Sequence, residues 1–305
     1  MANLLWKTSK ETKSLASTPF STEEEFERLV FDTPAILEDI FLLKRQIRGG
    51  SKSGIPDIIG IDNDGNVCIL EMKNVEVDAR IIPQVLQYAF WAEENPDSIK
   101  SLWLECENKP DDLSISWEDF EVRIIIIAPR ILPSTLDIVK KINYAVDLVE
   151  VKRWMNGDDQ LLLVNKLEPE IDKPRIRTVS GHEKYDEEFY KKERNLKSVA
   201  PFMRYCREVE SLVKRKGWLL ETKYNKHYCG YKSGFFNAFG VKWVTSKTFA
   251  FFFKISQAEA RKAKMPMTRY ETQWKEAVYY IDPSTTKVRD FAPLFEFAYK
   301  KLTGQ

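Results

Sequence analysis

Two short apolar runs separated by a turn sequence constrain the fold of this chain more than any other feature. Residues 58–61 (IIGI) and 67–70 (VCIL) carry no charged side chain, a composition typical of strands that are covered on both faces. Between them lies Asn63-Asp64-Gly65, which favours a three-residue hairpin loop with Gly65 in the left-handed position. The chain is therefore expected to build a sheet around a buried central hairpin.

The charged residues at the open end of this hairpin need an explanation, because burying an isolated charge is costly unless it is paired or holds a metal. With a three-residue loop, Ile59 pairs with Ile69 and Asp57 pairs with Glu71, so the two carboxylates face each other. A two-residue loop would place them on opposite faces. Lys73 lies two residues beyond Glu71 and therefore on the same face of its strand.

This arrangement predicts a metal site. Two neighbouring carboxylates repel, and one of them normally takes up a proton. A divalent cation removes the conflict, and oxygen ligands with room for water and a phosphate suit Mg²⁺ or Mn²⁺. Such an ion lowers the pKa of bound water and neutralises charge that develops on a phosphate. Lys73 would orient the attacking water, deprotonate it or balance charge. The alternative interpretation is an ion-pair cluster at a sheet edge.

The spacing of these residues matches a known signature. Pro56-Asp57, thirteen further residues and then Glu71-Met72-Lys73 resemble the motif of the PD-(D/E)XK nuclease superfamily. Each half of the motif lies at the edge of an apolar run. The resemblance implies an α/β fold with a restriction-endonuclease-like mixed sheet core flanked by helices.

A second motif follows on a helix expected at residues 79–94. Gln84 and Tyr88 resemble the QxxxY motif of RecB-like and NucS-like members of the superfamily, and their spacing places them on one helix face. In such members these residues would hold a phosphate or support the catalytic site. Arg80, one turn earlier, is a candidate nucleic-acid contact. The similarity covers residues 18–155, and a tyrosine that simply packs in the core is the alternative for the motif.

The resemblance also implies roles for individual residues. Asp57 and Glu71 would bind the metal, and Lys73 would handle the attacking water. The superfamily places a further glutamate on its first helix, and Glu27 is the choice here as the third metal ligand. Glu23, one helical turn earlier on the same face, is the alternative.

The formal net charge of +1 hides a division of the chain. Residues 1–174 contain 20 Lys and Arg against 32 Asp and Glu, a net charge of −12, whereas residues 175–305 contain 27 against 14, a net charge of +13. A basic region attracts polyanions. We therefore expect a nuclease domain at 1–170, a Pro- and Gly-containing linker at 171–184, and a basic domain at 185–305 that aids substrate or partner binding. Accidental charge bias is the alternative.

The basic domain shows helical patterns around several strand-like stretches, which predicts an α+β fold with an antiparallel sheet. Its candidate nucleic-acid contacts are cations at the end of a long helix and Lys interleaved with Tyr on one expected strand face. They are Lys214, Arg215, Lys216, Tyr224, Lys226, Tyr228 and Lys232. The alternatives need no ligand. Cations are favourable at a helix C-terminus, which explains Lys214 to Lys216. A half-buried sheet with Lys at its edge explains the Tyr and Lys residues.

Together these features predict a Mg²⁺- or Mn²⁺-dependent deoxyribonuclease that hydrolyses phosphodiester bonds in DNA. The alternatives are a catalytically silent DNA-binding protein of the same fold, an RNA-directed nuclease, and a nuclease subunit of a defence or repair complex. We expect DNA as the partner, with a second copy of the chain or repair and defence proteins as further candidates. Without an 18-residue apolar run or a signal-peptide pattern, a cytoplasmic, membrane-free protein is expected.

Extended segments are further expected at 101–105, 121–128 and 146–151, with a helix at 134–143.

Overall fold

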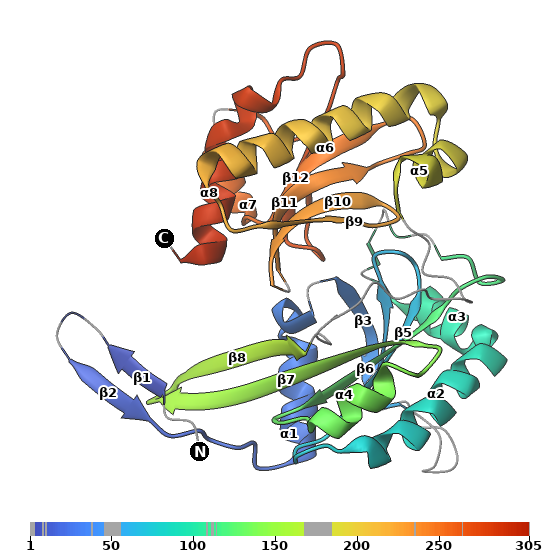
Figure 1. Cartoon of the computed structure of the whole chain (residues 1–305), viewed down its shortest axis with the longest axis vertical. Helices are drawn as coiled ribbons and strands as arrows, with labels where there is room; N and C mark the ends of the chain where they lie inside the picture. The colour runs from blue at the N-terminus through green and yellow to red at the C-terminus, as the bar shows by residue number, and fades with distance from the viewer. Residues whose placement is uncertain are drawn as a thin grey trace. The chain divides into compact units, whose positions relative to one another are not determined.

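A computed structural model of the chain forms two compact units (Figure 1). It describes residues 4–7, 9, 11–37, 39–45, 56–107, 109–110, 113, 115–167, 185–234, 236–263 and 265–304. The first unit comprises Met1–Glu107 and Ile115–Thr178, and the second comprises Asn108–Ser114 and Val179–Gln305. The linker expected at 171–184 lies outside the described residues.

A six-stranded mixed sheet forms the centre of the first unit. Its strands, in spatial order, are β3 (Ile40–Arg45), β4 (Ile58–Asp62), β5 (Val67–Met72), β6 (Val122–Ala128), β7 (Ala145–Asn156) and β8 (Asp159–Leu167). The pairs β5–β6 and β6–β7 are parallel, and the other neighbours are antiparallel. This sheet confirms the α/β class expected from the sequence.

Helices flank the mixed sheet because parallel neighbours need long crossover connections. The β5–β6 crossover contains η2 (Ala79–Ile81), α2 (Ile82–Glu94) and α3 (Pro96–Glu105), and α4 (Pro133–Val139) lies between β6 and β7. Helix α1 (Glu23–Asp32), capped by the Thr22 side chain, is followed by η1 (Pro34–Leu37). It contacts β3 and β5, whereas α2 contacts β5 and β6. Two strands, β1 (Leu4–Lys7) and β2 (Thr12–Leu15), form a separate hairpin.

The prediction of a strand at 101–105 is wrong, because these residues form the second half of α3. Pro96 begins the helix at a position that tolerates proline. Ile99 is fully buried, and Trp103 follows at helical spacing with its ring edge against Phe41. A window of five residues is too short to separate a period of two from one of 3.6.

The central hairpin has the predicted register. Ile59 pairs with Ile69, and Gly65 has a φ of +86°. The Gly65 N–H donates to the carbonyl oxygen of Asp62 at 3.0 Å, closing the loop. Every residue of β4 and β5 is buried, so these strands are covered on both faces. This packing fixes the positions of the residues at the strand ends.

The second unit is built on a six-stranded antiparallel sheet, which confirms its predicted class. Its strands, in spatial order, are β13 (Arg269–Glu271), β14 (Glu276–Tyr280), β12 (Phe249–Phe253), β11 (Phe236–Trp243), β10 (Tyr228–Ser233) and β9 (Glu221–Tyr224). Its helices are α5 (Glu187–Glu193), α6 (Leu196–Lys216), α7 (Gln257–Arg261), η3 (Val288–Phe291) and α8 (Ala292–Thr303). One face of the sheet packs with α6 and α8 into an aromatic core (Figure 1).

The prediction that Tyr224 and Tyr228 lie on one face of a single strand is wrong. A turn reverses the chain between them, with the Asn225 N–H donating to the Tyr228 carbonyl oxygen at 2.8 Å, so β9 and β10 are antiparallel neighbours. Tyr224 packs against the aromatic core. Tyr228 is 9% exposed and meets the Phe252 ring edge-on at a centroid distance of 5.6 Å.

Replacing Tyr228 with Ala should therefore destabilise the protein rather than its complex with nucleic acid. Loss of a buried ring should lower the free energy of unfolding by about 2–3 kcal/mol. Tyr280→Ala is the matched control, because Tyr280 lies in the same sheet and is 43% exposed. Thermal unfolding and single-strand titration of both variants would show the difference. A weakened complex with unchanged stability would mean that Tyr228 stacks on bases.

Candidate active site

The ends of β4 and β5 bring two carboxylates together. Asp57 directly precedes β4, and its Oδ2 accepts a hydrogen bond from the Met72 N–H at 2.8 Å. Glu71, in β5, is fully buried. Its Oε1 lies 2.6 Å from Lys73 Nζ and 2.7 Å from Gln84 Nε2. Its Oε2 is buried and has no hydrogen-bond partner among the described residues.

Burial and mutual repulsion shift the pKa values of this pair. Burial, followed by the charge of Asp57, raises the pKa of Glu71 to about 8, even though Lys73 opposes the shift. Burial also raises the pKa of Asp57 above its usual range. For Lys73, burial favours a lower pKa, but its ion pairs with Glu71 and Glu23 outweigh burial and raise the pKa. The raised pKa values show that the two carboxyls, when both are ionised, carry more negative charge than Lys73 alone balances.

Helix α1 adds two further carboxylates. Oxygen atoms of Glu23, Glu27 and Asp57 all lie within 4.8 Å of one another. Glu27 is 6% exposed and lies 3.9 Å from Arg45, whereas Glu23 lies 2.9 Å from Lys73 Nζ. Both candidates for the helix carboxylate thus reach the site. The i, i+4 spacing of the two glutamates was the signal for a shared face.

Helix α2 supplies the amide and the hydroxyl of the second motif. Gln84 Nε2 donates to Glu71 Oε1 and also, at 2.6 Å, to the Tyr88 hydroxyl oxygen. Tyr88 is 7% exposed, so its ring packs in the core while its hydroxyl meets Gln84. Arg80 lies in η2, with a side chain that is 91% exposed and an ion pair to Asp78 at 2.7 Å.

The structure therefore brings together seven of the residues considered from the sequence, at the adjoining ends of β4 and β5 and on α1 and α2. They are Glu23, Glu27, Asp57, Glu71, Lys73, Gln84 and Tyr88. Carboxylate oxygens are the donors that a hard divalent cation prefers. The unpartnered oxygen of Glu71 and the charge conflict with Asp57 both fit such an ion.

The candidate nucleic-acid contacts of the second unit are dispersed. Lys214 pairs with Glu210 at 2.7 Å and Lys216 with Glu296 at 3.2 Å at the end of α6, whose C-terminus favours cations. Arg215 is exposed on the same turn. Lys226 lies in the β9–β10 turn, and Lys232 is mostly buried, 3.8 Å from Glu221.

No family model matches the chain. It is similar to curated proteins named Endonuclease NucS, with 28% identity over 136 residues to that of Pyrococcus horikoshii, covering 44% of this chain and 43% of the relative. The protein of Pyrococcus abyssi is 26% identical over the same length and coverage. That of Pyrococcus furiosus is 34% identical over 68 residues, covering 22% of this chain and 25% of the relative.

Two solved structures match a similar share of this chain. A repair endonuclease from Pyrococcus abyssi is 24% identical with a TM-score of 0.29, covering 44% of this chain and 50% of that one. An EndoMS–dsDNA complex is 23% identical with a TM-score of 0.30, covering 42% and 44%. The resemblance to NucS-like nucleases is thus confirmed by the curated relatives, of whose length the match spans less than half.

No helix within the described ranges is both long enough and apolar enough to span a membrane.

Proposed function

We propose that this chain is a metal-dependent nuclease that hydrolyses phosphodiester bonds in DNA through a site of the PD-(D/E)XK type. The observation that carries the proposal is the environment of Glu71, which is buried, faces Asp57 and retains one oxygen without a hydrogen-bond partner in the described part of the chain. Similarity to curated endonucleases supports the same activity.

Mg²⁺ or Mn²⁺ fits the donor set at this site. Asp57 and Glu27 would hold the ion together with Glu71, the carboxylate beside Asp57. Glu23 lies close enough to take part, because its carboxylate oxygen lies within 4.8 Å of those of Glu27 and Asp57. When bound, the ion would supply an activated water and stabilise charge that develops on the scissile phosphate. The fixed register of the β4–β5 hairpin orients Asp57 and Glu71 before any ion arrives, which limits the reorganisation that binding requires.

Lys73 would balance charge and donate hydrogen bonds, rather than serve as a base. Its ammonium group lies between Glu71 and Glu23 at 2.6 and 2.9 Å, an arrangement that stabilises the protonated form. From this position it can donate to a phosphate oxygen or to the attacking water. Gln84 would fix the Glu71 carboxylate through the bond from its amide, with the Tyr88 hydroxyl holding that amide in place.

The direct test is incubation of the purified full chain with linear duplex, branched and single-stranded DNA. Cleavage products should form with Mg²⁺ or Mn²⁺ and should be absent with EDTA, because the carboxylates alone provide no activated water. Comparing the three substrates also identifies the preferred DNA structure. Equal cleavage with and without EDTA, or none with either ion on any substrate, would contradict a metal-dependent nuclease.

A further inference from the structure

A basic groove lies within the second unit, between α6 and residues 287–292. Its volume is ≈ 680 Å³. Six cations line it, namely Arg204, Arg207, Arg215, Lys216, Lys287 and Arg289. Glu208 is the acidic residue of the lining, and the apolar lining residues are Leu212, Val288 and Ala292. The groove is therefore a concave surface with a strong excess of positive charge.

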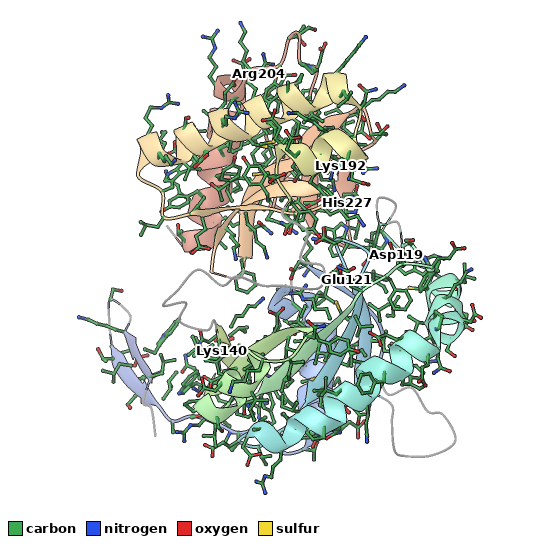
Figure 2. The ribbon with its side chains drawn as sticks, turned by 45° about the vertical axis from the view of Figure 1, so that its right-hand side comes forward. Asp119, Glu121, Lys140, Lys192, Arg204 and His227 are labelled. Carbon is green, nitrogen blue, oxygen red and sulfur yellow. The ribbon has the colours of Figure 1, made fainter. Side chains whose placement is uncertain are left out.

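Helix α6 presents its cations as a stripe. Arg204, Arg207, Ser211 and Arg215 follow one another at intervals of three or four residues, which places them on one helix face. The opposite face contributes residues such as Phe202 to the aromatic core. Arg204 lies on the side of α6 that points away from the sheet (Figure 2). At 1.5 Å per residue the stripe is roughly 16 Å long.

Four of the six groove cations form ion pairs, but their side chains are at least 44% exposed and remain accessible to a ligand. Arg204 lies 3.7 Å from Glu208 and Arg207 lies 3.2 Å from Glu187, with arginine side chains that are 52% and 62% exposed. Exposed pairs of this kind contribute at most about 1 kcal/mol. Arg215 and Lys287 are exposed, and neither forms an ion pair with any residue in the described ranges.

Helix stability does not explain the whole stripe. The helix dipole favours cations within the last turn, which accounts for Arg215 and Lys216. Arg204 and Arg207 lie further from that end, where the dipole has little effect. Lys287 and Arg289 come from another part of the chain, yet they line the same groove. Convergence of separate segments on one charged surface is typical of an anion-binding site.

We infer that this α6–η3 groove binds the sugar-phosphate backbone of duplex DNA without reading its sequence. The inference rests on the proposed nuclease function for the choice of DNA as the polyanion. Among the residues that the structure describes, no aromatic side chain lines the groove to stack on unpaired bases. A helix that lies on a lipid surface would expose an apolar face beside its cations, but the apolar face of α6 is buried in the core. Phosphate contacts of this kind position a protein without specifying sequence.

The test compares two charge-matched triple variants of the full chain, in EDTA so that no cleavage occurs. Arg207→Gln, Arg215→Gln and Lys287→Gln remove three groove cations. Lys247→Gln, Arg261→Gln and Lys262→Gln remove three exposed cations from elsewhere in the second unit. Each protein is titrated with one 20-bp duplex at several salt concentrations, and thermal unfolding verifies that both variants fold.

The groove triple should bind at least about tenfold more weakly at low salt, and its log–log salt slope should be smaller by about 2–3, since each phosphate contact contributes about 0.9. The control triple should retain the wild-type slope. Equal losses in both triples, or an unchanged slope in the groove triple, would overturn the inference. So would loss of binding to phosphatidylserine vesicles with unchanged binding to the duplex.

Cleavage with Mg²⁺ or Mn²⁺, measured separately, keeps the two proposals apart. Groove-dependent binding without cleavage by the wild-type chain contradicts the nuclease function and leaves the groove as a DNA site. Metal-dependent cleavage together with unchanged binding by the groove triple contradicts the groove and leaves the nuclease function.

Discussion

Replacing Glu71 with Ala should reduce DNA cleavage in Mg²⁺ or Mn²⁺ by more than about 10²-fold, the scale on which loss of a charge-stabilising group at a reacting centre acts. Glu71 is the buried carboxylate on which Asp57, Lys73 and Gln84 converge. Under the proposed function its removal would take away a metal ligand, and it would leave Lys73 and Gln84 without their shared partner. Initial rates at saturating metal, on the preferred substrate, would measure the effect.

Binding of DNA in EDTA should survive this substitution, because phosphate contacts elsewhere supply most of the backbone affinity. Glu76→Ala is the matched control. It removes the same charge five residues further along the chain, at an exposed position 2.9 Å from Arg130. The control should cleave at the wild-type rate. Wild-type cleavage by the Glu71 variant would place the active site elsewhere, and equal losses in both variants would indicate a nonspecific charge effect.

The hairpin could be predicted from the sequence because its determinants are local. Gly65 is required where the loop enters the left-handed region, and a period of two then fixes which residues pair across the strands. The positions of Asp57 and Glu71 follow from that register alone. The i, i+4 spacing of Gln84 and Tyr88 fixed their shared helix face in the same way.

The remaining parts of the site depend on tertiary packing. Glu23 and Glu27 share one helix face, so only the docking of α1 on the sheet shows that both reach Asp57. The α6–η3 groove is likewise invisible in the sequence, because Lys287 lies more than 70 residues beyond Arg215. Strand β8 was not predicted, although Asn156-Gly157 before it is a recognised hairpin signal and Gly157 has a φ of +64°.

Replacing Arg123 with Met should lower the free energy of opening of β6 and β7 by about 3–5 kcal/mol, the cost of breaking a buried ion pair by removing one partner. The Arg123 side chain is 15% exposed and pairs with Asp147, with Asp62 at 3.5 Å and with Asp39 at 3.6 Å. Lys166, 2.6 Å from Asp147, would remain as a cation for three carboxylates. Native-state hydrogen exchange of the β6 and β7 amides measures this energy directly.

Arg130→Met provides the control, because Arg130 is 66% exposed and its pair with Glu76 should contribute less than about 1 kcal/mol. The pH dependence gives a second, independent readout. Burial favours a raised pKa for Asp147, but Arg123 and Lys166 outweigh it and lower the pKa. In the wild type this stabilisation is therefore present above the unfolded pKa of about 3.9 and is lost as the pH falls further.

In the Arg123 variant the pH dependence of stability should have the opposite sign. Asp147 keeps Lys166 but loses its guanidinium partner, and burial already raises the pKa of Asp62. Carboxyls with raised folded-state pKa values take up protons more readily in the folded protein, so acid stabilises the variant relative to neutral pH. The difference in opening free energy between wild type and variant should consequently narrow as the pH falls from 7 through these raised pKa values to about 4, and should narrow further below it as the wild type loses its own stabilisation. A difference that stays constant from pH 7 to pH 4 would show that Arg123 acts through packing of its side chain rather than through its charge.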